Sequence, residues 1–221
     1  MPTQSQSFSR PIAVPAVNKV IRNTYTLLSL TLLFSALMAG LAIATEAPPL
    51  PWWMVLIGYF GLLFLTNALR NSAWGLASVF ALTGFMGYTL GPVISLYLGL
   101  ANGPQIVMMA LAGTGSIFLG LSGYALVSRR DFSFMGGFLM VGILVAFLAG
   151  IGAILFALPG LSLAVSAMFV LLMSGLILYE TSQIIHGGET NYIMATVTLY
   201  VSIYNLFLSL LHLLGAFTGE E

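Results

Sequence analysis

The chain has 221 residues, of which 59% are hydrophobic and only 5% are charged, whereas soluble domains carry roughly 25% charged residues. Six Lys and Arg balance six Asp and Glu, so there is no basic field to attract nucleic acid. The absence of cysteine excludes disulfides, Cys zinc sites and thiol catalysis, and the composition predicts a protein whose main solvent is the lipid bilayer.

The first 23 residues differ in composition from the rest of the chain. They are rich in Ser, Thr, Gln and Pro and contain Arg10, Lys19 and Arg22. Such a segment cannot bury a core, so we expect residues 1–23 to form a flexible tail. The apolar stretch 24–45 that follows is long enough for a membrane-spanning helix and too long for the apolar region of a cleaved signal peptide.

Short clusters of Gly, Pro and charged residues divide the rest of the chain at regular intervals. The predicted spans are 24–45, 51–69, 75–98, 104–127, 134–157, 161–185 and 190–217. Continuous apolar runs without alternation favour helices over a β-barrel. We therefore expect an all-α bundle of seven transmembrane helices over 24–217, a short C-terminal tail at 218–221 and no inverted repeat.

The basic residues all fall on one side of the predicted membrane topology. They lie in the N-terminal tail, in the loop after the second span at Arg70, and in the loop after the fourth span at Arg129 and Arg130. Basic residues are enriched in cytoplasmic loops, so the N-terminus is predicted to be cytoplasmic. With seven spans, the C-terminus then lies in the periplasm of a bacterium that has an outer membrane.

Glu180 is the one carboxylate well inside a predicted span, about five residues or roughly 8 Å from the cytoplasmic end of the sixth. Ionisable groups inside membranes are costly and by default mark proton or ion pathways. The alternatives are a structural hydrogen bond to the seventh helix, or a charge that reaches the cytoplasmic interface.

The seventh span carries a stripe of polar residues on one helical face: Thr198, Ser202, Asn205, Ser209 and His212. Such a stripe is expected to face other helices, where it either holds helices together or lines a hydrated pathway. Because the sixth span is next in the chain, the polar stripe and Glu180 predict a candidate ion or proton site of Glu180, Ser202 and Asn205.

Two further motifs lie in the third and fourth spans. Gly91 and Pro92 predict a kink in the third helix, which serves either helix packing, the favoured interpretation, or a gate. The G-x-S-G sequence around Ser122 has the form found in rhomboid intramembrane proteases, but neither histidine lies on a helical motif that would oppose this serine. No zinc-protease motif, phosphate loop or pair of catalytic aspartates is present, so we expect no enzyme, no cofactor and no firm metal site.

Three stretches resemble the Bax inhibitor-1 family, also called the transmembrane BAX inhibitor motif family. They are Gly87-Tyr-Thr-Leu-Gly-Pro92, Ala110-x-x-x-Thr-Gly-x-x-Phe118, and Tyr179-Glu-Thr-Ser-Gln-Ile-Ile-His-Gly187 together with Leu199-Tyr-Val-Ser-Ile-Tyr-Asn-Leu-Phe207. The segments around Lys19 and Glu189 are similar to the proteobacterial YccA branch in particular. The resemblance covers the chain after the tail and implies a seven-helix bundle.

The resemblance implies two functions of different classes. Proteins of the YccA branch are substrates and modulators of FtsH, a membrane-anchored AAA+ protease that begins degradation at a flexible cytoplasmic tail, here residues 1–23. Other prokaryotic members form a pH-sensitive calcium leak with one carboxylate on each of helices six and seven. Glu180 matches the first carboxylate, but Ser202 stands at the second position and cannot ionise. We therefore expect an FtsH modulator, with a leak of Ca²⁺ or other cations, gated by H⁺ at Glu180, as the alternative.

Overall fold

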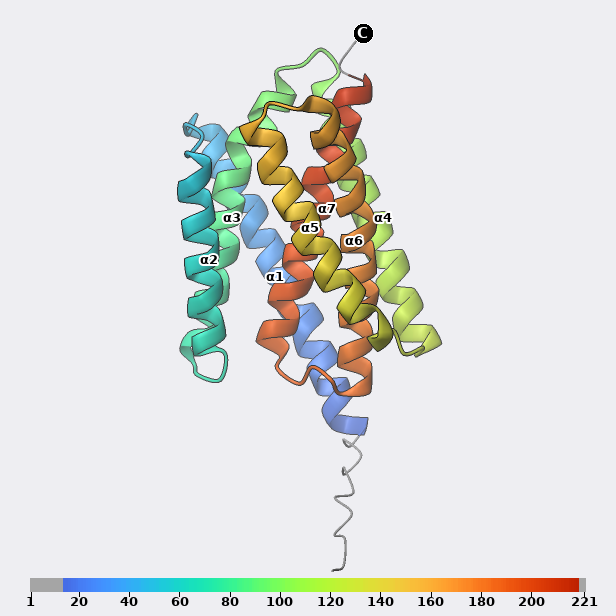
Figure 1. Ribbon diagram of the computed structural model, residues 1–221. Helices are drawn as coiled ribbons and strands as arrows, with labels where there is room; N and C mark the ends of the chain where they lie inside the picture. Colours follow the sequence, from blue (N-terminus) through green and yellow to red (C-terminus); the bar gives the residue numbers. More distant parts are fainter. Residues whose placement is uncertain (1–13, 219–221) are drawn as a thin grey trace, which may run out of the picture.

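The computed structural model describes residues 14–218, which form a bundle of seven helices (Figure 1). The helices are α1 (Val14–Ala44), α2 (Trp52–Leu69), α3 (Trp74–Leu98), α4 (Gly103–Ser128), α5 (Gly136–Leu155), α6 (Pro159–His186) and α7 (Tyr192–Thr218). A short 3₁₀ turn, η1 (Ser133–Met135), precedes α5. All seven helices are long and apolar enough to cross a membrane, which confirms the predicted fold class.

Helix α1 begins at Val14, ten residues before the predicted start of the first span. Residues 14–23 were expected to belong to the tail, and this part of the prediction is wrong. Pro15 stands in the first turn, where a missing backbone N–H costs nothing. Val20 and Ile21 pack against the buried core, so this segment has an apolar helical face despite its polar composition. Residues 1–13, with Arg10, and residues 219–221 lie outside the described part of the chain.

Successive helices run in opposite directions, so the start of α1 and the α2–α3, α4–α5 and α6–α7 connections lie at one end of the bundle (Figure 1). We call this the basic end, because the described basic residues lie there: Lys19 and Arg22 in the first turns of α1, and Arg70, Arg129 and Arg130 in the connections. The described chain finishes at the opposite end of the bundle, which we call the far end (Figure 1).

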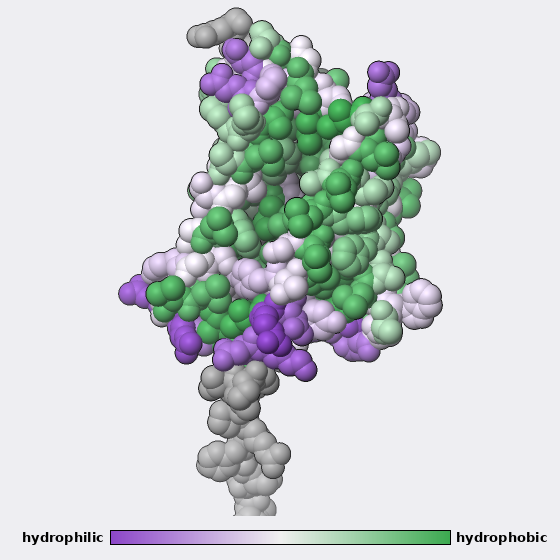
Figure 2. All heavy atoms as spheres, turned by 180° about the vertical axis from the view of Figure 1, so that it is seen from behind, coloured by the Kyte–Doolittle hydropathy of each residue, from purple (hydrophilic) through white to green (hydrophobic). Residues whose placement is uncertain are grey.

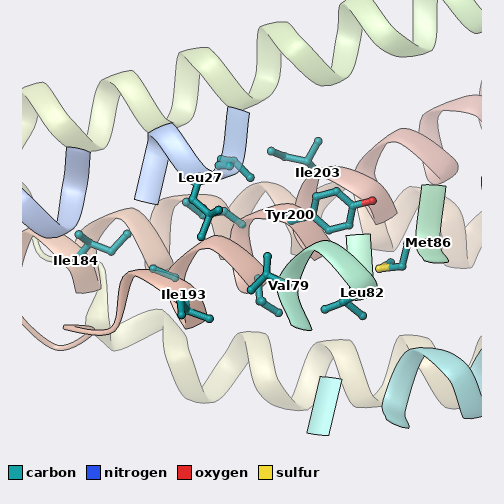
Figure 3. Close-up of a cluster of buried hydrophobic side chains, with 12 residues drawn as sticks. Leu27, Val79, Leu82, Met86, Ile184, Ile193, Tyr200 and Ile203 are labelled. Carbon is teal, nitrogen blue, oxygen red and sulfur yellow. The ribbon is translucent and has the colours of Figure 1, made fainter. Parts of the chain in front are cut away.

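Helix α7 lies at the centre of the bundle and packs against α1, α3, α4 and α6. The largest buried cluster joins residues of α1, α3, α6 and α7, among them Leu27, Leu82, Ile184 and Tyr200 (Figure 3). Helix α2 packs on α3 and helix α5 packs on α6 at the periphery. Their outward faces are apolar, and the surface between the two polar ends is mainly hydrophobic (Figure 2). A hydrophobic belt of this kind matches a bilayer rather than water.

The most extensive contact between two helices of the bundle joins α1 and α3. Gly87 and Gly91 are buried against the backbone of α1, where a Cβ atom at either position would collide with the carbonyl oxygen of Ser35 or of Ala39. Small residues let membrane helices approach closely in this way. Helix α3 continues as one helix through Pro92, so Gly91 serves the contact with α1, and the kink at Gly91 and Pro92 stays a prediction.

Candidate functional site

Glu180 lies on α6, less than two turns from the basic end of that helix. Its side chain is only 7% exposed. Its carboxyl group makes no hydrogen bond with any residue of the described chain, although α6 packs against α1, α4, α5 and α7 around it. A largely buried carboxyl group inside a membrane-spanning helix is an expensive feature, which is why such groups usually have a role beyond packing.

Side chains in the polar stripe of α7 form hydrogen bonds largely with the backbone of their own helix. Ser202 is fully buried, and its hydroxyl donates to the carbonyl oxygen of Thr198 at 2.8 Å. The side-chain amide of Asn205 donates to the carbonyl oxygen of Val201 at 2.9 Å. Within residues 14–218, neither side chain forms a hydrogen bond with Glu180. A joint site of Glu180, Ser202 and Asn205 therefore stays a prediction.

The far-end part of the stripe holds two helices together. The hydroxyl of Ser166 on α6 lies 2.8 Å from Nδ1 of His212 on α7, and Ser209 on α7 is buried one turn before His212. Interhelical hydrogen bonds of this kind stabilise membrane bundles. For His212, the structure supports adhesion between α6 and α7 rather than a hydrated pathway.

A hydroxyl cluster near Glu180 was not predicted from the sequence. The hydroxyl of Tyr25 on α1 bonds that of Ser122 on α4, and Thr181 on α6 lies within 3.3 Å of the same Tyr25 oxygen. Ser122 and Thr181 are buried, and the hydrogen bonds of this cluster join α1, α4 and α6 beside Glu180. The sequence signal was a pair of hydroxyl residues in apolar spans, but it could not reveal their partners, which lie far away in the chain.

The same cluster bears on the protease motif around Ser122. The serine bonds a tyrosine, and each histidine in the described chain has another partner: His186 bonds Ser182 and its backbone, and His212 bonds Ser166. A serine and histidine dyad at Ser122 is therefore absent from this arrangement. Within residues 14–218, no group of three His, Cys, Asp or Glu comes together as a set of metal ligands.

The loop between α4 and α5 is tied to α6 at Ser182, two residues after Glu180. The buried hydroxyl of Ser182 accepts a hydrogen bond from the backbone N–H of Phe132 at 2.9 Å and donates to the carbonyl oxygen of Arg130 at 3.3 Å. In the same loop, the backbone N–H of Ser133 donates to the carboxylate of Asp131, which lowers the pKa of Asp131. The exposed cations Arg129 and Arg130 are thereby held close to the end of α6.

The comparisons with known proteins agree with this architecture. The family described as "Inhibitor of apoptosis-promoting Bax1" matches residues 17–219, which is nearly the whole chain. The chain belongs to the Bax inhibitor-1 family. The resemblance in the spans around Gly91, Thr114 and Glu180 is thus confirmed at the level of the whole domain.

Relatives in this family come from several bacteria. A protein of Escherichia coli K12 named "Modulator of FtsH protease YccA" is 51% identical over 200 residues, which cover 90% of this chain and 91% of the relative. An uncharacterised protein of Pseudomonas aeruginosa is 55% identical over 205 residues, or 93% and 92% of the two chains. An uncharacterised membrane protein of Vibrio cholerae is 40% identical over 220 residues, or 99% and 97%.

The relatives also bear on location. A second Escherichia coli relative, 51% identical, is named "Inner membrane protein YccA". Together with the seven apolar helices, this supports a multi-pass protein of the bacterial inner membrane.

Proposed function

We infer that this Bax inhibitor-1 family member modulates the membrane protease FtsH. The observation that carries the inference is the identity of 51% over 200 residues with the Escherichia coli protein named as a modulator of that protease. The match spans 91% of the relative, so it includes the whole bundle rather than one motif. FtsH is thus the proposed protein partner, and the chain acts by association rather than by catalysis.

The distribution of charge supports a cytoplasmic N-terminus. The basic end carries all the described Lys and Arg residues, and such residues are retained on the cytoplasmic side during insertion. Helix α1 has 31 residues and is therefore about 46 Å long, which exceeds the hydrocarbon thickness of about 30 Å. Its first turns, with Lys19 and Arg22, then project toward the cytoplasm, and the C-terminus lies in the periplasm.

We place the point of engagement in residues 1–13, ahead of the first turn of α1. A protease that pulls on this segment must extract α1 first. That helix packs more extensively on α3 than on any other element, and it also contacts the central α7. Extraction therefore begins with a tightly packed helix, which makes the chain a slow substrate. A slow substrate occupies the protease and restrains its attack on other membrane proteins.

The test uses purified FtsH and this chain in proteoliposomes with a second membrane substrate. The full chain is expected to slow degradation of the second substrate, and a variant without residues 1–13 is expected to lose this effect while keeping its helical content. A variant with residues 1–13 in scrambled order is the matched control and should behave as the full chain does. Equal inhibition by the truncated and full chains would refute the proposed point of engagement.

A cation leak is the second candidate function, favoured by the position of Glu180, a largely buried carboxyl group inside a membrane-spanning helix. Ser202 and Asn205 supply neutral oxygen atoms on the neighbouring helix, which suit weak binding of a hydrated cation such as Ca²⁺. The test is calcium flux into liposomes between about pH 6 and pH 8. Flux that is lost in Glu180→Gln but kept in Glu189→Gln, which changes a carboxylate in the α6–α7 connection, would support the leak.

A further inference from the structure

A cavity of about 430 Å³ lies between α1, α3, α4 and α7, apart from Glu180. Helix α1 packs chiefly on α3 and α7, and α4 packs chiefly on α7 and α6, so the cavity occupies the place where α1 and α4 diverge. Seen from behind, the molecule has a hollow in a mainly hydrophobic face (Figure 2). The volume falls within the range of about 300–1,000 Å³ found for small-molecule sites.

The cavity extends from the middle of the bilayer core toward the far end of the bundle. On α7 it is lined from Tyr200 to Phe207, close to the middle of a helix that extends from Tyr192 to Thr218. On α4 it is lined from Leu111 to Phe118, again near the middle of the helix. The part of the opening beside these residues therefore faces hydrocarbon, and on α1 the lining continues to Ile43, one residue before the far end of that helix.

The lining has few groups that could form hydrogen bonds with water. It contains no charged side chain, and most of the lining residues are aliphatic or aromatic. Its polar groups are largely used within the protein, since the hydroxyl of Thr114 donates to the carbonyl oxygen of Ala110 at 2.7 Å. A buried water needs two to four polar partners, whereas an empty apolar cavity forfeits dispersion contacts along its whole wall.

The cavity is too small to enclose a membrane-spanning helix of a partner or of a second copy, which needs about five turns of 5.4 Å each. A slender, flexible hydrocarbon chain meets the requirements of size, depth and polarity together.

We propose that this cavity is a binding site for one acyl chain of a bilayer phospholipid, which enters between α1 and α4. Gly115 on α4 and Gly40 on α1 keep the site open, because a Cβ atom at either position would meet nothing within 4 Å. The acyl chain packs against the ring of Tyr200 on the inner wall.

The inner wall ties the site to the rest of the bundle. The hydroxyl of Tyr200 accepts from the hydroxyl of Ser35 on α1 at 2.6 Å and donates to the carbonyl oxygen of Thr83 on α3 at 3.2 Å. Tyr200 thus joins α7 to both helices beside the cavity. Helix α4 makes little direct contact with α1, so the cavity between them stays open. A bound acyl chain fills this space and packs against the wall that Tyr200 forms.

The experiment measures phospholipid that stays bound when the full chain is purified from membranes in detergent and analysed by native mass spectrometry. The wild-type chain is expected to retain one phospholipid after mild delipidation. Gly115→Leu, which places a side chain in the cavity, is expected to lose it. Gly120→Leu is the matched control, because Gly120 lies on the same helix, also has open space at its Cβ position, and does not line the cavity.

A second measurement does not depend on the folding of any variant. Phospholipid with a photoreactive group in one acyl chain is crosslinked to the wild-type protein in liposomes, and adducts are mapped to peptides. The expected result is enrichment at residues 111–118 and 32–43 over the outward face of α5. Uniform labelling of all lipid-facing helices, retention of detergent or free fatty acid without phospholipid, or equal retention by Gly115→Leu and Gly120→Leu would each overturn the proposal.

Discussion

Substitution of Gly91 by alanine measures how tightly α1 and α3 are packed. A Cβ atom at this position would lie 2.5 Å from the Cβ of Ala42 and 2.8 Å from the carbonyl oxygen of Ala39. Carbon atoms pack at about 3.5–4.0 Å, so the two helices must separate locally by about 1 Å. Overpacking of this kind costs about 1–3 kcal/mol, against which alanine gains up to about 1 kcal/mol in helix propensity.

Gly120→Ala is the reference variant, because it gains the same helix propensity without any collision: nothing lies within 4 Å of a Cβ atom there. The difference in unfolding free energy between Gly91→Ala and Gly120→Ala should therefore be about 1–3 kcal/mol, or roughly 5- to 150-fold in the unfolding equilibrium. The assay is reversible unfolding by SDS in mixed micelles, followed by circular dichroism. If both variants unfold at the same SDS fraction, the inferred close contact between α1 and α3 is wrong.

Three further predictions concern single polar groups. Tyr200→Phe removes a hydroxyl that joins α7 to α1 and α3 and should cost about 0.6–1.7 kcal/mol in the same SDS assay. Ser182→Ala leaves the backbone N–H of Phe132 without its partner, so hydrogen exchange at that amide should be roughly tenfold faster while exchange in α7 is unchanged. The hydrogen bond from the Ser133 amide lowers the pKa of Asp131, so this carboxylate stabilises the loop fully above the usual carboxyl pKa of about 4, and the contribution is lost as pH falls from there through the lowered pKa of the folded state. Asp131→Asn should therefore lower the unfolding temperature near pH 7, and the difference from the wild type should shrink steadily as the pH is lowered below about 4, whereas a difference that stays constant would contradict this account.

The number, order and limits of six helices were predictable from the sequence. A span must be apolar for about 20 residues and must satisfy its own backbone hydrogen bonds, and both requirements are local properties of one segment. Helix α1 is the exception, because Val20 and Ile21 are isolated apolar residues in a polar segment, and their role depends on the core against which they pack. The polar stripe residues all lie on α7, but their hydrogen-bond partners could not be predicted from the sequence.

By itself, the sequence determined that this is a seven-helix membrane protein with an acid inside the sixth helix. Only the tertiary structure decided that Ser122 bonds Tyr25, that His212 bonds Ser166, and that a cavity separates α1 from α4. The physical reason is that lipid gives apolar helices no hydrophobic preference for one another. Their pairing depends on matching shapes and interhelical hydrogen bonds, which belong to two surfaces at once and cannot be read from either segment alone.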